Sequence, residues 1–193
     1  MADKKYWNKP VPGFGDINAT VLILGLAPGP HGANRTGRPF TGDAAGEMVY
    51  GALYDCGKSS SATGLSRQDG LTLTGIYITN TVKCVPPGNL PKAEEVCNCL
   101  NWFDLEIRKL KYVQTIMCLG GLAFEALKKH LIQVDSRYGV LKKTRFHNGV
   151  RIDPGGELYK IVGLYHPSRR NVNTGLVTYK SFSDSFKAIC QDA

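Results

Sequence analysis

Long apolar runs are missing from this sequence, and their absence limits where the protein can act. No stretch approaches the roughly 20 apolar residues of a membrane span. Residues 1–7 also lack the apolar segment of a signal peptide. We therefore expect an intracellular protein, cytoplasmic or, in a eukaryote, nuclear, with no membrane partner. In that compartment the six cysteines are expected to be thiols or metal ligands rather than disulfides.

Acidic residues are scarce relative to basic ones. The chain has 16 Asp and Glu against 24 Lys and Arg, a formal net charge of +8. Such a surplus favours a polyanionic partner, because cations that meet phosphates release counterions. A basic surface that only aids solubility is the alternative. Phosphate-binding Gly-x-Gly-x-x-Gly and Walker A motifs are also missing, which weakens the interpretation as a nucleotide-binding α/β enzyme.

Strand-like and helix-like patterns alternate along the 193 residues, a length that suits one domain over residues 1–193. Prolines and glycines predict an irregular arm over residues 1–19. The patterns predict strands at 21–25, 75–80, 113–119 and 159–165, and helices at 44–55, 92–109, 122–131 and 179–190. This order predicts a three-layer α/β/α sandwich around a short, mainly parallel four-stranded sheet. Ligands of such sheets bind beyond the carboxyl ends of the strands.

Three segments at predicted strand ends contain the unusual residues. Residues 25–29 read Gly-Leu-Ala-Pro-Gly, and residues 31–43 continue as His-Gly-Ala-Asn-Arg-Thr-Gly-Arg-Pro-Phe-Thr-Gly-Asp. Residues 78–89 read Ile-Thr-Asn-Thr-Val-Lys-Cys-Val-Pro-Pro-Gly-Asn, and residues 166–171 read His-Pro-Ser-Arg-Arg-Asn. Together they resemble the iron–sulfur branches of the uracil-DNA glycosylases, and the type 5 (B-form) branch most closely. The resemblance covers nearly the whole chain from about Tyr6.

This resemblance implies a DNA repair enzyme of uracil-DNA glycosylase type. Such an enzyme hydrolyses the N-glycosidic bond of uracil in damaged DNA and leaves an abasic site, and other deaminated bases are further candidate substrates. We expect the protein to act as a monomer on uracil-containing DNA. A lesion-binding protein of the same fold with little catalysis is the alternative, because residues 26–29 contain no polar side chain to activate water.

Bond cleavage needs a group that stabilises the anionic base and a surface on which the extruded base stacks. By resemblance, His166 donates a hydrogen bond to a uracil carbonyl, and Phe40 stacks on the ring. Asn80 is expected to read the base edge, because an amide both donates and accepts. The alternatives are a capping histidine, a core phenylalanine and an asparagine that caps a turn.

Asp43 is the nearest carboxylate to the first segment, and we expect it to orient the attacking water. It also precedes the predicted helix 44–55 and is a good N-cap, so the two roles are compatible. Asn89 is a further candidate for positioning water or phosphate. The backbone that approaches the base is expected at Gly25, Leu26, Ala27, Pro28 and Gly29, with a plain tight turn as the alternative.

Basic and polar residues beside these segments are expected to contact DNA phosphates. They are His31, Arg35, Arg38, Ser168, Arg169, Arg170 and Asn171. The two arginines at 169 and 170 lie in the part that resembles the family's minor-groove insertion loop. Lys83 is the lysine nearest to the pocket and does not clearly lie in it, so we expect hydrolysis without a Schiff base.

The cysteine pattern departs from the family. Members of these branches hold a 4Fe-4S cluster on four cysteines, and Cys84 and Cys99 match the second pair. The first pair has no counterpart, because no cysteine precedes Cys56. Two thiolates do not normally retain such a cluster, so we expect it to be absent or incomplete. The other readings are that Cys97 completes the site, that a dimer pools two pairs, or that the missing cysteines lie outside this sequence.

Overall fold

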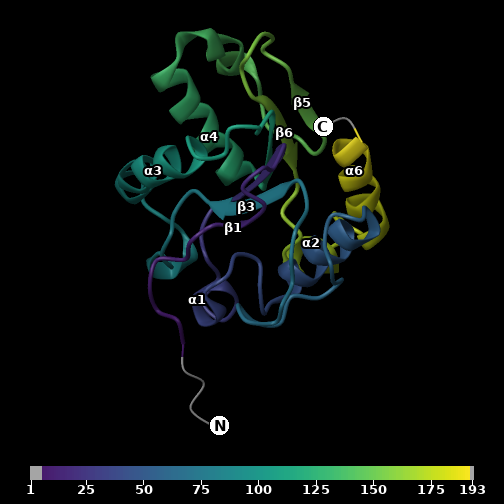
Figure 1. The fold of residues 1–193 in the computed structure, drawn as a ribbon. Coiled ribbons are helices and arrows are strands. Elements are labelled where there is room, and N and C mark those ends of the chain that lie inside the picture. Colours follow the sequence, from purple (N-terminus) through teal and green to yellow (C-terminus); the bar gives the residue numbers. More distant parts are fainter. Residues whose placement is uncertain (1–5, 192–193) are drawn as a thin grey trace.

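The computed structural model describes residues 6–191 and shows a six-stranded sheet between two layers of helices (Figure 1). The strands are β1 (Phe14–Gly15), β2 (Val21–Gly25), β3 (Ile76–Asn80), β4 (Thr115–Leu119), β5 (Val150–Ile152) and β6 (Lys160–Leu164). The helices are α1 (Ala33–Thr36), α2 (Ala44–Asp55), α3 (Ala93–Ile107), α4 (Gly121–Val134), α5 (Arg169–Asn173) and α6 (Tyr179–Gln191). Two 3-10 helices, η1 (Pro87–Asn89) and η2 (Ser136–Lys143), complete the set.

Four parallel strands form the centre of the sheet, in the order β3-β2-β4-β6. All five residues of β2 are buried, as expected for a strand that is covered on both faces. The register pairs Gly25 with Asn80 at the carboxyl ends of β2 and β3. Leu119 pairs with Leu164 at the same ends of β4 and β6. The predicted α/β fold with its central parallel strands is therefore confirmed.

Two short antiparallel strands at the edges of the sheet differ from the prediction. β1 pairs with β3 through Phe14 and Gly15, inside the arm that was expected to be irregular. β5 pairs with β6 at the other edge. These strands have two and three residues, too few for an alternating pattern to be recognised. The sheet thus has six strands rather than four, and the prediction for residues 14–15 is wrong. Residues 1–5 of the predicted arm lie outside the described residues.

Each face of the sheet is covered by a pair of helices, α2 and α6 on one side and α3 and α4 on the other (Figure 1). Phe182 and Phe186 of α6 are buried against the first face, and Phe103 of α3 and Phe124 of α4 fill the second. Burying a side chain of this size contributes about 1.5–3 kcal/mol, so these rings attach the helices to the sheet. None of the helices within residues 6–191 is long and apolar enough to cross a membrane.

Two very short helices follow the strands at the carboxyl edge. α1 follows β2 and has four residues, and α5 follows β6 and has five residues. Ser168 caps α5 by accepting a hydrogen bond from the backbone N–H of Asn171. These helices hold the loops after β2 and β6 in place, and the candidate site lies between those loops.

Candidate active site

A small cavity of about 140 Å³ lies at the carboxyl ends of β2, β3 and β6. It is lined by Ala27, Pro28, Gly29, Ala33, Phe40, Asp43, Ala45, Asn80 and His166. The three segments singled out in the sequence therefore converge on one place. Pockets for drug-sized ligands have volumes of about 300–1,000 Å³, so this cavity suits one flat ring rather than a larger molecule.

His166 stands on a tight turn directly after β6. Its backbone carbonyl accepts hydrogen bonds from the Ser168 N–H and from Nδ2 of Asn171, both at 2.8 Å. Neither ring nitrogen is hydrogen-bonded to another residue within the described range 6–191. Burial lowers the pKa of His166, and the nearby Asp43 carboxylate partly opposes that shift. The site therefore holds a neutral imidazole with free hydrogen-bonding capacity beside the cavity.

Phe40 forms one wall of the cavity from an unusual backbone conformation. Its φ is +49°, in the left-handed region that is costly for a side chain of this size. Its ring centroid lies 6.0 Å from that of His166, with 32° between the ring planes. Tyr50 donates a hydrogen bond from its hydroxyl to the carbonyl of Pro39, at 3.0 Å. The surrounding contacts thus hold the ring where it can cover a flat ligand.

Arg38 supports this loop from inside the protein. Its guanidinium forms two hydrogen bonds to the carboxylate of Asp69, at 2.7 and 2.6 Å, and donates from Nε to Oγ1 of Thr41 at 2.9 Å. Only 2% of the Arg38 side chain is exposed. A phosphate on the surface would not reach it, so this geometry speaks against the predicted DNA contact, and Arg38 serves the loop instead.

Asn80 lies at the end of β3 with its amide against Gly25. A Cβ at position 25 would collide with Oδ1 of Asn80 and would crowd the ring of Phe40, so this position requires glycine. Asn80 is 4% exposed, and no residue within 6–191 is hydrogen-bonded to its side-chain amide. Buried amides usually have partners. Here the unused donor and acceptor border the cavity.

Asp43 combines a structural role with a position beside the cavity. Its Oδ1 accepts a hydrogen bond from the Gly46 N–H at 2.9 Å and so caps α2. Its Oδ2 lies against Gly32, where a Cβ would collide with it, and near Gly29. One oxygen therefore stabilises the helix, while the other faces the loop that lines the cavity.

Leu26 and Asn89 lie away from the cavity, and Gly25 does not line it but packs against Asn80 and Phe40, which do. Leu26 packs against the apolar core between the sheet and α3/α4, although its neighbours Ala27, Pro28 and Gly29 line the cavity. Asn89 is exposed in η1 with a φ of +61° and does not line the cavity. This placement speaks against a role for Asn89 in positioning water.

The predicted phosphate contacts fall into two groups. Arg169 and Arg170 are exposed on α5, immediately after the His166 turn. His31 is exposed, and its Nδ1 lies 2.9 Å from the hydroxyl of Tyr6. By contrast, Ser168 and Asn171 are engaged within the turn itself, where their visible role is structural.

Three residues with structural or lining roles were not anticipated from the sequence. Ala33 and Ala45 line the cavity, and Asp69 neutralises Arg38. Alanines leave no chemical signature, and Asp69 lies 31 residues from its partner in a polar loop. No local pattern could have identified them.

The two cysteines expected to be cluster ligands lie in a separate hollow of about 560 Å³, beside α3. Cys84 and Cys99 both line it. Burial raises the pKa of Cys84, and the neighbouring Cys99 adds to this shift. Cys97 is exposed and does not line the hollow. Among residues 6–191, no group of three or more potential ligands could hold a metal ion, so this donor set does not fit a 4Fe-4S cluster, which normally requires four thiolates.

Lys83, the lysine that was expected nearest to the cavity, does not line it. Nζ of Lys83 donates hydrogen bonds to Oγ1 of Thr79 and to the carboxylate of Glu106, both at 2.5 Å. The ion pair with Glu106 is largely buried. Lys83 is therefore not positioned to attack a ligand in the cavity.

The chain is similar in sequence to proteins of one enzyme family. The family model described as the uracil DNA glycosylase superfamily matches residues 12–193. A type-5 uracil-DNA glycosylase of Thermus thermophilus is 44% identical over 179 residues, which cover 92% of this chain and 77% of that protein. A type-5 uracil-DNA glycosylase of Pyrobaculum aerophilum is 39% identical over 97% of this chain and 78% of its own length. A type-4 uracil-DNA glycosylase of the same organism is 33% identical over 85% of this chain and 74% of its own length.

Of these relatives, the two type-5 proteins are more similar to the chain than the type-4 protein is. This order agrees with the branch that the sequence motifs indicated. The chain therefore belongs to the uracil DNA glycosylase superfamily.

Proposed function

We propose that this chain removes uracil from DNA by hydrolysing its N-glycosidic bond and leaves an abasic site. The observation that supports this most is the convergence of His166, Phe40 and Asn80 on a cavity of about 140 Å³. These three side chains come from segments far apart in the sequence. They supply a donor, a stacking surface and an edge-reading amide for one extruded base.

The base is held by stacking and by its polar edge. Phe40 offers a ring face that tolerates any base, so discrimination falls to Asn80. Its amide can donate to a uracil carbonyl and accept from the imide N–H at the same time. Because no described residue fixes which end of this amide faces the cavity, Asn80 can turn to meet the edge of another deaminated base.

His166 stabilises the leaving base. As the bond between C1′ and the base nitrogen breaks, negative charge develops on the uracil, and a ring N–H of His166 donates to its carbonyl oxygen. Because burial lowers the pKa of His166, the imidazole is neutral at physiological pH. A neutral donor stabilises the anion while the site stays largely free of competing solvent.

Asp43 positions the water that completes the reaction. Oδ1 is occupied by the cap of α2, which leaves Oδ2 to accept a hydrogen bond from water. The water oxygen bonds to C1′ of the cationic sugar and transfers its proton to the carboxylate. Because Lys83 is paired with Glu106 away from the cavity, no covalent adduct forms and the strand remains intact.

DNA binding is assigned to the basic surface around the cavity. Arg169 and Arg170 begin α5, separated from His166 by two residues, and phosphate contacts there would hold the backbone while the base is extruded. We also propose that the enzyme acts as a monomer. A DNA substrate supports an intracellular location. We assign no 4Fe-4S cluster to these residues alone, because Cys84 and Cys99 are the only cysteines in the described part of the chain that line the hollow beside α3.

A protein that binds the lesion without cleaving it is the second candidate. It is favoured by one observation, the purely apolar side chains of residues 26–29 beside the cavity. Single-turnover incubation with a uracil-containing duplex separates the two functions. The proposed enzyme releases uracil, and the strand breaks only after alkaline treatment. Binding without release of uracil would establish the lesion-binding function instead.

A further inference from the structure

A second hollow, of about 700 Å³, lies beside the loop that forms the active-site cavity. It is lined by Tyr6, Trp7, Lys9, Arg35, Thr36, Leu65, Ser66, Arg67 and Gln68, and we name it the Trp7 groove. Its walls come from the segment before β1, from α1, and from the polar loop after α2. Nothing in the proposed chemistry uses this groove, although it contains both basic and aromatic side chains.

The charges of the Trp7 groove all have one sign. Lys9, Arg35 and Arg67 line it, and none of its lining residues is acidic. Within residues 6–191 none of these three cations forms an ion pair with a carboxylate, whereas the buried Arg38 nearby is neutralised by Asp69. Three uncompensated cations around one hollow produce a positive potential that attracts an anion.

Trp7 arranges two of these cations. The guanidinium carbon of Arg67 lies 4.6 Å from the ring centroid of Trp7, and Nζ of Lys9 lies 5.8 Å from it. Both distances are within the range of cation–π attraction. Stacking restricts these flexible side chains, so less conformational entropy is lost when they meet a ligand.

The indole is itself held firmly. Its Nε1 donates to the carbonyl of Pro10 at 3.2 Å, and the Trp7 backbone N–H donates to the carbonyl of Arg35 at 3.1 Å. A Cβ on Gly37, whose φ is +76°, would lie only 2.8 Å from Cδ2 of Trp7. The ring therefore packs against the backbone that ends α1, and it serves as a fixed platform for the cations.

Arg35 connects the Trp7 groove to the active site. Its Nε donates to the carbonyl of His31 at 2.8 Å, and its Nη2 donates to the carbonyl of Gly42 at 3.2 Å. Gly42 directly precedes Asp43, which lines the cavity. The groove and the cavity therefore share the loop of residues 31–43.

We propose that the Trp7 groove binds backbone phosphates of the DNA strand beside the extruded nucleotide. A planar guanidinium can donate hydrogen bonds to two phosphate oxygens at once. The residues that line the groove include no carboxylate that would repel a polyanion. This inference rests on the proposed function, because the strand reaches the groove when its base occupies the cavity. It adds a second set of contacts to the DNA backbone, separate from the contacts proposed for α5.

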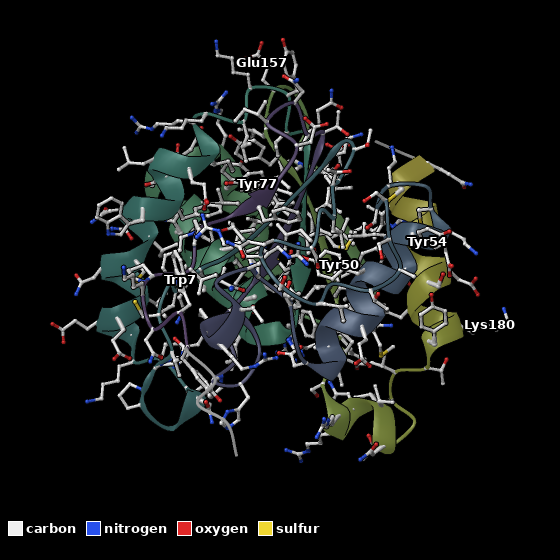
Figure 2. The ribbon with its side chains drawn as sticks, turned by 60° about the horizontal axis from the view of Figure 1, so that its bottom comes forward. Trp7, Tyr50, Tyr54, Tyr77, Glu157 and Lys180 are labelled. Atoms are coloured by element: carbon white, nitrogen blue, oxygen red, sulfur yellow. The ribbon has the colours of Figure 1, made fainter. Side chains whose placement is uncertain are left out.

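The test measures binding of a duplex that carries a non-cleavable abasic-site analogue, by fluorescence anisotropy over a series of salt concentrations. Arg67→Ala is the test variant, because Arg67 is exposed and its loss leaves the core intact. Lys180→Ala is the matched control. Lys180 is an exposed cation on α6, and Figure 2 shows it at the opposite side of the molecule from Trp7.

Arg67→Ala is expected to weaken binding roughly threefold to tenfold. It should also reduce the slope of log affinity against log salt by about 0.9, the value for one lost phosphate contact. Arg67→Lys keeps the charge but loses the planar fork, so it should fall between wild type and Arg67→Ala. Lys180→Ala should leave both the affinity and the slope unchanged.

Two outcomes separate failure of this inference from failure of the proposed function. If the wild type releases uracil but Arg67→Ala binds as Lys180→Ala does, the Trp7 groove is not a phosphate site and the inference is wrong. If the wild type releases no uracil while binding still depends on Arg67, the groove holds DNA and only the assigned reaction fails.

Discussion

Asn171 of α5 donates a hydrogen bond from its side-chain Nδ2 to the backbone carbonyl of His166, at 2.8 Å. Asn171 does not line the cavity, yet it closes the turn on which the imidazole stands. The same carbonyl also accepts from the Ser168 N–H. The position of the proposed donor thus depends on a residue whose side chain lies outside the cavity.

Asn171→Ala is therefore expected to slow uracil release roughly tenfold, because a displaced donor stabilises the leaving base less well. The loss of one hydrogen bond should lower the free energy of unfolding by about 0.5–1.5 kcal/mol. Single-turnover rates and urea unfolding measure the two effects. Thr174→Ala is the matched control, because Thr174 caps the C-terminus of α5 and its hydroxyl donates to the backbone carbonyls of Arg170 and Asn171, which leaves the bond from the Asn171 side chain to His166 in place. Equal rates for both variants would show that Asn171 does not position the imidazole.

The pH dependence of uracil release should reflect the shifted pKa of His166. Burial lowers this pKa below its ordinary value of 6.5, so the neutral donor persists as the pH falls through 6.5 and is lost only in more acidic solution. The same shift makes the fold less stable in acid, because the unfolded state takes up this proton more readily. NMR titration of the imidazole checks the direction.

The Asp43→Asn variant sharpens that measurement. The Asp43 carboxylate is the group that raises the pKa of His166 against the effect of burial, so its removal should lower the pKa further. An imidazole that titrates above 6.5 in the wild type, or that titrates higher in Asp43→Asn, would contradict the described environment.

The ion pair of the buried Arg38 with Asp69 should be essential for the Phe40 loop. Asp69→Asn leaves the Arg38 guanidinium buried without its counterion, which is expected to cost about 3 kcal/mol of unfolding free energy at neutral pH. Because the pair holds the pKa of Asp69 well below its usual range, the difference from wild type should shrink as the pH falls below about 3.9.

Urea unfolding of wild type and Asp69→Asn tests this expectation. Asp184→Asn is the control, because Asp184 pairs with Lys180 at an exposed site and should cost less than about 0.5 kcal/mol. If the two variants lose the same stability, the Arg38–Asp69 pair does not support the loop.

Iron analysis tests the cysteine assignment. The chain of residues 1–193, purified anaerobically, should contain no stoichiometric iron or sulfide, because Cys84 and Cys99 are the only cysteines among residues 6–191 that line the hollow beside α3 and four thiolates are normally needed. Cys84→Ser should then leave the thermal unfolding midpoint nearly unchanged. Four irons and four sulfides per chain would overturn the assignment and would place further ligands with Cys84 and Cys99.

The sequence predicts the residues that line the cavity better than the residues that hold the surrounding loops in place. Asn80 and His166 could be located because Asn80 ends one buried strand and His166 follows another, and the carboxyl ends of parallel strands meet at one edge. The burial of Arg38 could not be foreseen, because arginines are mostly exposed and its partner Asp69 lies in a loop without periodicity. β1 and β5 were missed for a related reason, since two or three residues carry no recognisable pattern.

The central claim is that His166 stabilises the uracil anion as the glycosidic bond breaks. Single-turnover uracil release by wild type and His166→Ala tests it most directly, with His147→Ala as a control at an exposed histidine outside the cavity. We predict that His166→Ala slows release by a factor on the order of 10²–10³ with DNA affinity unchanged, while His147→Ala behaves as wild type. Release by His166→Ala at the wild-type rate would contradict this role of His166.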